Sequence, residues 1–518
     1  MQSPCEVSEE SVPQTVPVNG NSFCPPSSRR FVLIAAILAS ALGFIDGSVL
    51  AIAIPAIRSD LGASLVEAQW ISNGYALTLS ALILAGGAAG DRFGLRYTFI
   101  AGIGLFVLAS LACAMAPNPP ILVLFRAIQG AGAAIMVPCS LAIIAKAYPK
   151  KERGRAIGIW AAASALTTAL GPVLGGLMLA SFDESIWRAI FAINLPLGAI
   201  SIYLLLAKVP ADAPAGQRAL DLGGAALATL AFGALAYGLT AISSEGEGHL
   251  PGVSIAAGAV LLVVFVAWEL RQSEPMIDLA LFRSRAFAGA NLATFFLYFA
   301  LSANLFYLPM LLIAGWGLSA GEVGFIFLPL SACIALLSGQ VGRFSDRIGP
   351  RLPIAGGSLL VAIAFAGLAV MTHAGIHHFW TGAFLLMTLM GLGMALVISP
   401  LSTAIMTAVE DKDTGAASGI NNAVSRIAGL IAVAAMGSVA AWVYSRAPGI
   451  SGGAGVPGFG EPAPADLAHH LDMARIAAGD GAFAAVALIT ALLCLLSAVT
   501  AWVTIPGRSL PWLRRVES

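Results

Sequence analysis

Charged side chains are scarce in this sequence. Asp, Glu, Lys and Arg make up 10% of its 518 residues, whereas 58% of the residues are hydrophobic and the mean hydropathy is +0.88. A soluble domain needs more charges to cover its surface, whereas helices that face lipid need almost none in their middles. The formal net charge of zero leaves no basic surface for nucleic acid. We therefore expect a membrane protein whose surroundings are a lipid bilayer, with no nucleic-acid partner.

The sequence also lacks the signatures of metal, nucleotide and hydrolase sites. Its six cysteines are single, without a C-x-x-C pair, which argues against a zinc site, a haem attachment or a disulfide framework. It has no G-x-x-x-x-G-K-[ST], G-x-S-x-G or H-E-x-x-H motif, so ATP is not the expected energy source. We expect no cofactor and no metal. A membrane-embedded enzyme would need a clustered nucleophile, base or metal site, and the sequence indicates none.

Apolar stretches long enough to cross about 30 Å of hydrocarbon alternate with short polar breaks from Phe31 onward. The pattern predicts an all-α polytopic protein with fourteen spans, and residues 1–30 and 506–518 are predicted to be tails, the first of them disordered. The spans are predicted at about residues 31–57, 66–89, 97–116, 121–146, 156–181, 189–207, 221–243, 252–270, 287–313, 322–342, 352–371, 380–406, 417–444 and 482–505.

Lysine and arginine are strongly biased toward one set of breaks. The opposite set of breaks holds only four of these residues, namely Arg58, Arg188, Arg446 and Arg475. Basic residues favour the cytoplasmic loops of membrane proteins. An even number of spans with both termini in the cytoplasm fits this bias, and we expect a multi-pass protein of the cell membrane, either a bacterial inner membrane or a plasma membrane.

An internal repeat supports the count of spans. The loop after the second predicted span reads GDRFGLR at residues 90–96, and the loop after the tenth reads SDRIGPR at residues 345–351. Transporter halves often arise from duplicated units. Because eight spans rather than six separate the copies, we predict six-helix halves at 31–208 and 287–505 with two extra helices at 209–286. The second half is predicted to carry an external loop at about 446–481.

Three ionisable residues lie deep inside predicted spans, where each costs about 2.5 to 3.5 kcal/mol on insertion scales. Asp46 lies in the first span, and desolvation of its carboxylate suits a proton carrier. A permanent pair with an arginine, or a cap on a broken helix, is the alternative. Arg126 either tunes a nearby acid or forms a fixed ion pair that orders helices. Arg426 is interpreted as a packing or snorkelling residue.

Glycines at four-residue spacing let helix backbones approach closely. The fifth predicted span contains the densest group, Gly171, Pro172, Gly175 and Gly176, in which the proline removes a backbone hydrogen bond and permits a bend. Spacing of this kind indicates either a hinge or close packing.

Four segments together resemble the major facilitator superfamily, and within it the fourteen-span drug:proton antiporter branch. They are the loop GAAGDRFGLR at 87–96, FIDGSVLAIAIP at 44–55, LFRAIQG at 124–130, and the glycine and proline positions of the fifth span. The resemblance covers nearly the whole chain from Phe31 to Pro506. It implies two six-helix bundles around a central cavity that opens alternately to each side, with the two extra helices outside this core.

The resemblance also implies residue roles. Asp46 and Arg126 would couple transport to protons, and the glycine group of the fifth span would act as an antiporter hinge. The charges of the two repeated loops would form a cytoplasmic gate, namely Asp91, Arg92, Arg96, Asp346, Arg347 and Arg351. Candidate side chains of the substrate cavity are Tyr75, Trp160, Asn291, Tyr298, Asn304 and Asn421.

The expected function is proton-coupled export of drugs or other amphipathic small molecules. Import or export of a specific metabolite on the same fold is the main alternative. With Asp46 as the single deep acid, neutral or monocationic solutes are expected more readily than dications.

Overall fold

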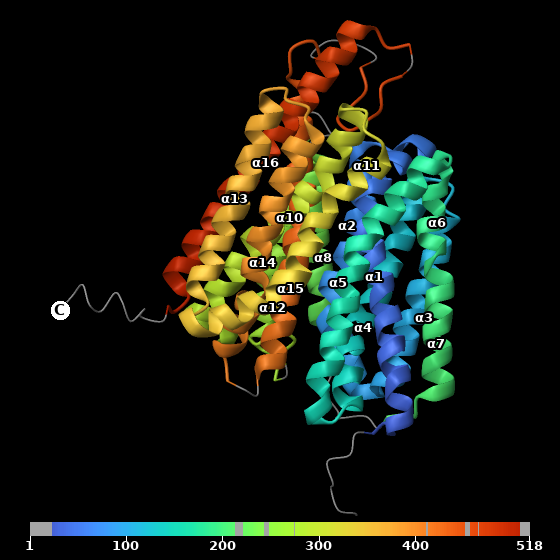
Figure 1. The fold of residues 1–518 in the computed structure, drawn as a ribbon, viewed down its shortest axis with the longest axis vertical. Coiled ribbons are helices and arrows are strands. Elements are labelled where there is room, and N and C mark those ends of the chain that lie inside the picture. Colours follow the sequence, from blue (N-terminus) through green and yellow to red (C-terminus); the bar gives the residue numbers. More distant parts are fainter. Residues whose placement is uncertain are drawn as a thin grey trace, which may run out of the picture.

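The computed structural model describes residues 23–212, 221–242, 248–273, 275–410, 413–450, 456–464 and 466–507. Within these ranges the chain forms helices joined by short loops, and fourteen helical segments are long and apolar enough to cross a membrane. The predicted all-α polytopic fold with fourteen spans is confirmed, and the long, nearly parallel helices are evident in Figure 1.

Two groups of helices form the halves of the molecule, and a pair of helices lies between them in the sequence. The N-terminal half contains α1 (Pro26–Leu61), α2 (Leu65–Phe93), α3 (Leu95–Ala114), α4 (Pro119–Ala147), α5 (Lys150–Ser181), α6 (Trp187–Ala192) and α7 (Asn194–Lys208). The intervening pair is α8 (Leu222–Ala241) and α9 (Leu250–Glu269). The C-terminal half contains α10 (Arg285–Met310), α11 (Ala320–Gly324), α12 (Leu328–Ile348), α13 (Arg351–His373), α14 (Phe384–Thr407), α15 (Thr414–Ser445) and α16 (His469–Thr504).

Several spans are composite. Helices α6 and α7 form the sixth span together, and α11 and α12 form the tenth. A π-helical turn at Leu311–Gly315 lengthens α10, and another at Phe379–Ala383 precedes α14. Such turns locally replace the regular hydrogen-bond ladder while the backbone stays internally bonded, as a membrane requires.

The ends of the helices define two faces of the molecule. We call the face that carries Arg30, Arg92, Lys146, Arg347 and Arg351 the basic face, and the other one the opposite face. Helix α1 begins at the basic face and α16 ends there (Figure 1). The connection from α15 to α16 lies at the opposite face.

The two halves repeat the same local structure. Helices α2 and α11 each begin with a capping box, in which Ser64 pairs with Glu67 and Ser319 pairs with Glu322. The two D-R-x-G loops end on glycines with positive φ, 90° at Gly94 and 87° at Gly349. Because other residues rarely adopt such angles, the glycines fix the same turn twice and support the duplication predicted from the sequence.

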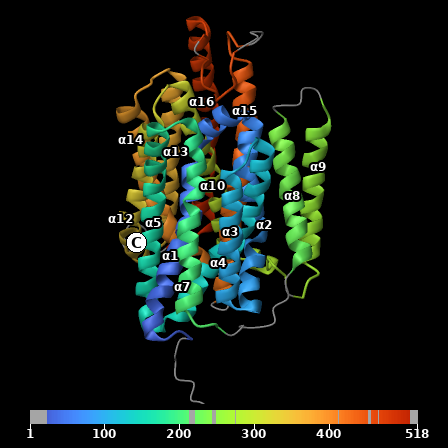
Figure 2. The ribbon, with the colours of Figure 1, turned by 90° about the vertical axis from the view of Figure 1, so that its right-hand side faces the viewer.

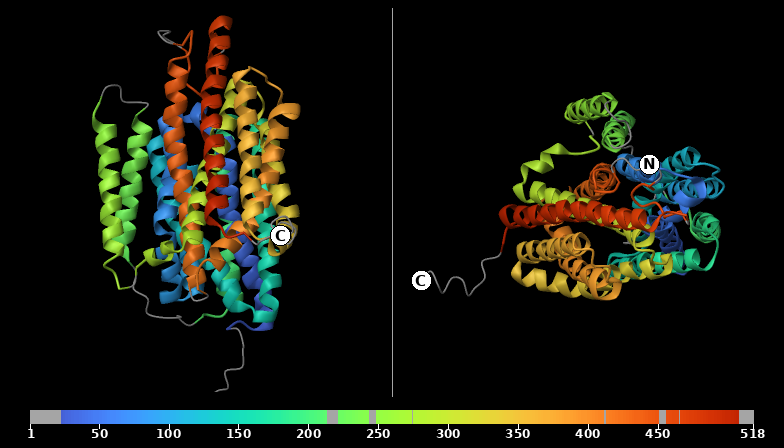
Figure 3. Two further views of the ribbon diagram at one scale, coloured as in Figure 1. Left: turned by 90° about the vertical axis from the view of Figure 1, so that its left-hand side faces the viewer. Right: turned by 90° about the horizontal axis from the view of Figure 1, so that it is seen from above.

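Helices α8 and α9 stand outside the two halves, as Figures 2 and 3 show. They pack against each other, and α8 also packs on α2 of one half and α15 of the other. The extra pair therefore lies over the junction between α2 and α15. Between α9 and α10, the buried Glu269 accepts a hydrogen bond from the backbone N–H of Ile277 at 2.9 Å.

Two predicted boundaries need correction. Helix α1 begins at Pro26, so part of the predicted tail is helical, and residues 1–22 lie outside the described ranges. Helix α16 begins at His469, so the last part of the predicted external loop belongs to this helix. The first turns of α16 are polar and protrude at the opposite face, where hydropathy alone cannot distinguish a helix extension from a loop (Figure 1). Of the predicted C-terminal tail, residues 508–518 lie outside the described ranges.

Candidate transport site

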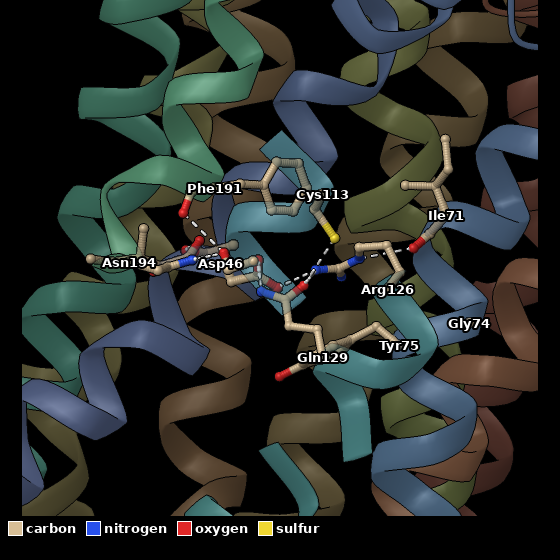
Figure 4. A network of polar contacts seen from close by, with 12 residues as sticks. Asp46, Ile71, Gly74, Tyr75, Cys113, Arg126, Gln129, Phe191 and Asn194 are labelled. Carbon is tan, nitrogen blue, oxygen red and sulfur yellow. Dashed lines mark hydrogen bonds and ion pairs between the residues drawn. The ribbon is translucent and has the colours of Figure 1, made fainter. Parts of the chain in front are cut away.

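A buried polar network connects α1 and α4 in the N-terminal half. Arg126 Nη1 lies 2.5 Å from Asp46 Oδ2, and Gln129 Nε2 donates to Asp46 Oδ1 at 3.0 Å. Arg126 Nη1 also donates to Gln129 Oε1 at 2.7 Å, which closes a ring of three side chains (Figure 4). Each of the three residues is at most 1% exposed. The carboxylate of Asp46 is therefore hydrogen-bonded on both oxygens and screened from the space between the halves.

The guanidinium of Arg126 has further partners that make its burial tolerable. Its Nε donates to the carbonyl oxygen of Ile71 at 3.0 Å, and its carbon Cζ lies 4.4 Å from the ring centroid of Tyr75. The ring of Phe191 lies on it at 5.7 Å. A buried arginine needs hydrogen bonds and aromatic contacts of this kind to offset the loss of hydration.

The structure thus brings together the two residues that were predicted to couple transport to protons. The sequence did not identify their partner Gln129, although its position three residues after Arg126 places both side chains on one face of α4. The alternative of an arginine-paired aspartate describes the arrangement seen here. The proton-coupling role itself stays a prediction.

Close packing of α2 on α4 holds Tyr75 against Arg126. A Cβ atom at Gly130 would lie 2.2 Å from Thr78 Oγ1 and 2.3 Å from the carbonyl oxygen of Tyr75. Thr78 Oγ1 also donates to the carbonyl oxygen of Ala127 across the same contact, at 2.7 Å. A residue larger than glycine at position 130 would force the two helices apart.

Two of the predicted cavity residues pack mainly within their own half. Trp160 Nε1 donates to Ser40 Oγ at 2.9 Å, and this bond joins α5 to α1. Asn304 is fully buried, and its Nδ2 donates to Thr490 Oγ1 of α16 at 2.7 Å. Asn304 therefore presents no surface to the space between the halves in this structure.

The other predicted cavity residues lie on α2, α10 and α15, of which α2 and α15 pack together across the halves, and Asn291 among them is buried. The Nδ2 atom of Asn421 on α15 donates to Thr294 Oγ1 at 2.8 Å and to Asn291 Oδ1 at 3.3 Å, both on α10. Tyr75 on α2 and Tyr298 on α10 belong to opposite halves, and both helices bond to α15, through Gln69 to Val433 and through Thr294 to Asn421. Arg426 is half-buried rather than packed in the interior.

The predicted hinge of α5 lies where this helix crosses α1 and the other half. A Cβ atom at Gly171 would lie 2.8 Å from Ser48 Oγ, and one at Gly175 would lie 2.3 Å from Val49 Cγ1, both on α1. A Cβ atom at Gly176 would lie 2.4 Å from the carbonyl oxygen of Ala320 on α11. Pro172 faces the other half as well, because a Cβ atom at Gly324 would lie 2.7 Å from its carbonyl oxygen.

Hydrogen bonds join the two halves near the opposite face, and the sequence did not identify them. Gln69 Nε2 donates to Tyr307 Oη at 2.7 Å and to the carbonyl oxygen of Val433 at 2.9 Å. Arg58 of α1 donates to the carbonyl oxygen of Phe459 at 2.8 Å and pairs with Glu461 at 2.6 Å. The halves are closed together at this end.

Helix α5 is packed differently along its length. Residues 171–173, 175 and 176 are buried, whereas Ala161, Ala162 and Leu166 on the side of the basic face are exposed. The packing of α5 against the other half is therefore concentrated toward the opposite face.

The two repeated loops at the basic face contact their own halves. Arg96 donates from Nε and Nη2 to the carbonyl oxygens of Leu205 and Leu206 at the end of α7, both at 2.9 Å. Arg351 lies with Cζ 4.0 Å from the ring centroid of Trp502 near the end of α16. The two arginines thus both contact the last span of their own bundle, Arg96 through hydrogen bonds and Arg351 through an aromatic ring.

The remaining loop residues lie at the surface of the same face. Arg92, Asp346 and Arg347 are exposed, and Asp91 is half-buried. The role of these residues in a cytoplasmic gate between the halves stays a prediction.

Asp212 is a buried anchor of the first loop that the sequence did not indicate. Its carboxylate accepts from the backbone N–H groups of Leu95 and Arg96 at 3.0 and 2.9 Å, and it pairs with Lys146 Nζ at 2.8 Å. Burial alone would raise the pKa of this carboxyl, but the hydrogen bonds from Lys146, Arg96 and Leu95 hold the pKa below its ordinary value.

The fold and the buried site define a polytopic membrane transporter built from two repeated six-helix bundles. In agreement with this class, the family model of the Major Facilitator Superfamily matches residues 36–433 and 290–516. The chain belongs to this superfamily.

Curated relatives and solved structures support this assignment. The chain is 35% identical over 419 residues to the multidrug resistance protein Stp of Mycobacterium tuberculosis, covering 80% of this chain and 77% of the relative. It is 31% identical over 428 residues to the tetracenomycin C resistance and export protein of Streptomyces glaucescens, covering 81% and 78%.

A bacterial homologue of the human lysosomal transporter Spinster matches the fold with a TM-score of 0.66 at 17% identity, covering 94% of this chain and all of that one. The D-xylose-proton symporter matches with a TM-score of 0.63 at 16% identity, covering 93% and 99%. These two likenesses concern the fold.

Proposed function

We propose that this protein is a proton-coupled antiporter that exports drugs or other amphipathic small molecules, and that it is not an enzyme. The basic face would be cytoplasmic, because lysine and arginine favour that side, and both termini would then be cytoplasmic. The names of the relatives from M. tuberculosis and S. glaucescens, which refer to multidrug resistance and to tetracenomycin C resistance and export, support this direction and class of solute.

The buried Asp46 carries this proposal. In this structure its side chain pairs with Arg126. A proton on Asp46 would remove the counter-charge of a guanidinium that is 1% exposed, and an uncompensated buried charge is strongly unfavourable. Protonation would therefore require α1 and α4 to rearrange, which links proton binding to a change of conformation.

The position of Asp46 along α1 connects this rearrangement with the junction of the halves. Ser48 and Val49, two and three residues later, contact the glycines of α5. The next glycine along α5, Gly176, contacts α11 of the other half. A shift of α1 would thus be transmitted to the contact between α5 and α11, which is the hinge role predicted for Gly171, Pro172, Gly175 and Gly176.

The energetics of one proton per solute are adequate. A proton that crosses 100 mV releases about 2.3 kcal/mol, and a tenfold solute gradient costs about 1.4 kcal/mol. The membrane potential alone would support a gradient of more than tenfold, and a pH gradient would add to it.

The proposal is tested in inside-out membrane vesicles whose lumen is acidified by respiration. Amphipathic solutes from a chemically varied panel are added, and a pH-sensitive dye reports loss of the pH gradient. We expect solute-induced loss with the native chain and none with Asp46→Asn. The matched control is Asp60→Asn, because Asp60 lies on the same helix and pairs with Arg188 at the opposite face. A response retained in Asp46→Asn, or absent from the native chain with every solute, would contradict the proposal.

A specific metabolite carrier on the same fold is the alternative. An importer that moves solute and proton together would not discharge the gradient when solute is added outside these vesicles. It would do so when the solute is enclosed in the lumen, so the side of addition separates the two functions.

A further inference from the structure

Arg426 is a cation near the middle of α15 that has no partner among the described residues. It lies twelve residues after Thr414, the first residue of α15, which corresponds to about 18 Å along the helix at 1.5 Å per residue. This depth is close to the middle of the span. The side chain is half-buried, and within the described ranges it forms neither a hydrogen bond nor an ion pair. Helix α15 packs against α2, α8, α10 and α16, so little of its surface faces lipid.

The surroundings of Arg426 belong to both halves. Asn421, five residues before Arg426, donates to Thr294 on α10, so Tyr298, one turn after Thr294, lies at the level of Arg426. Gln69 on α2 donates to the carbonyl oxygen of Val433, seven residues after Arg426, so Tyr75, six residues after Gln69 on a helix that runs the other way, lies at the same level. The other deep charges, Asp46 and Arg126, neutralise each other and are 1% exposed. Of these three deep charges, Arg426 is the one that is both partly accessible and without a counter-ion among the described residues.

We propose that Arg426, flanked by Tyr75 and Tyr298, forms a binding site for amphipathic aromatic monoanions, such as a carboxylate or phenolate on a planar ring system. This inference rests on the proposed export function and specifies its substrate class. A guanidinium offers a planar fork of donors that matches a carboxylate and also stacks on aromatic rings. The half-buried ring of Tyr298 supplies an apolar face for the ring system, whereas Tyr75, whose ring lies against Arg126, only borders the site. Bound anion would compensate the charge of Arg426, and a cation would be repelled by it.

The proposal replaces the expectation of neutral or monocationic solutes, which considered Asp46 alone. It also has a consequence for charge movement. With one proton imported per solute exported, a monoanion moves two charges per cycle in the same direction, a neutral solute moves one and a monocation moves none. Export of the anion would therefore respond most strongly to the membrane potential.

Three probes with one ring system test the charge preference, namely 2-naphthoate, 2-naphthamide and 2-naphthylmethylammonium. Their binding to the purified full-length protein in detergent is measured by calorimetry. We expect the native chain to bind 2-naphthoate about tenfold or more tightly than the amide, as for a charge-assisted hydrogen bond, and the ammonium most weakly. Arg426→Gln should remove this preference, and Arg426→Lys should retain part of it. Arg446→Gln is the matched control, because Arg446 is exposed at the end of the same helix.

The outcomes separate this proposal from the proposed function. Equal affinity for the three probes, tighter binding of the ammonium, no binding of 2-naphthoate, or an unchanged preference in a folded Arg426→Gln protein would each overturn the anion site. If Arg426→Gln loses the anion preference but still transports a neutral solute against protons, the result supports the site and leaves the transport proposal intact. Arg426-dependent binding of 2-naphthoate without proton movement for any solute supports the site and refutes proton coupling.

Discussion

Replacement of Gly130 by alanine should destabilise the contact that holds Tyr75 over Arg126. The added Cβ atom would lie 2.3 Å from the carbonyl oxygen of Tyr75, and an ordinary contact begins at 3.4 Å, so α2 and α4 must separate by about 1 Å (3.4 − 2.3 = 1.1). Overpacking of this kind costs about 1–3 kcal/mol. Because one of the two clashing atoms is backbone, a change of rotamer cannot relieve the strain.

The matched control is Gly104→Ala on α3, where a Cβ atom meets nothing within 4 Å. Alanine is the better helix former by up to about 1 kcal/mol, so this variant should be neutral or more stable than the native protein. Free energies of unfolding are measured by denaturant titration in mixed micelles. We also expect slower transport in Gly130→Ala because the ring of Tyr75 moves away from the guanidinium. Equal stability of the two variants would refute the reasoning.

Three further predictions concern the contacts outside this site. Arg58→Ala removes the donor to the carbonyl oxygens of Ala63 and Phe459, which costs about 1–3 kcal/mol. Proteolysis of the connection between α15 and α16 should therefore become faster, and unchanged cleavage would count against this anchor. Asp212 has a lowered pKa, so its ionised carboxylate stabilises the fold at neutral pH, and this effect is lost as the pH falls through the lowered pKa. Asp212→Asn should therefore be less stable than the native protein at pH 7 and equally stable in acid. Gly437→Ala places a methyl group 1.4 Å from the Gln69 Nε2 position, so the Gln69 amide must leave Tyr307 and Val433. The free energy of unfolding should fall by about 0.5–1.5 kcal/mol per lost hydrogen bond, unlike in Gly415→Ala, where a Cβ atom meets nothing within 4 Å.

The number and composition of the spans could be predicted from the sequence because both depend on local properties. Each span needs enough consecutive apolar residues to cross the hydrocarbon, and hydropathy reports this directly. The two D-R-x-G loops revealed the duplication because the turn requires glycine at Gly94 and at Gly349, where φ is positive. Hydropathy failed at the start of α16, where a polar helix extends beyond the apolar stretch.

The sequence by itself also singled out Asp46, Arg126 and Arg426, because a charge in the middle of an apolar run is conspicuous and costly. The tertiary structure alone decided which of them form a pair. The rotation and neighbours of α1, α4 and α15 place Asp46 against Arg126 and leave Arg426 half-buried between the halves. Asp46 and Arg126 are 80 residues apart in the chain, so their pairing depends on how the helices pack, and no local sequence pattern reveals it.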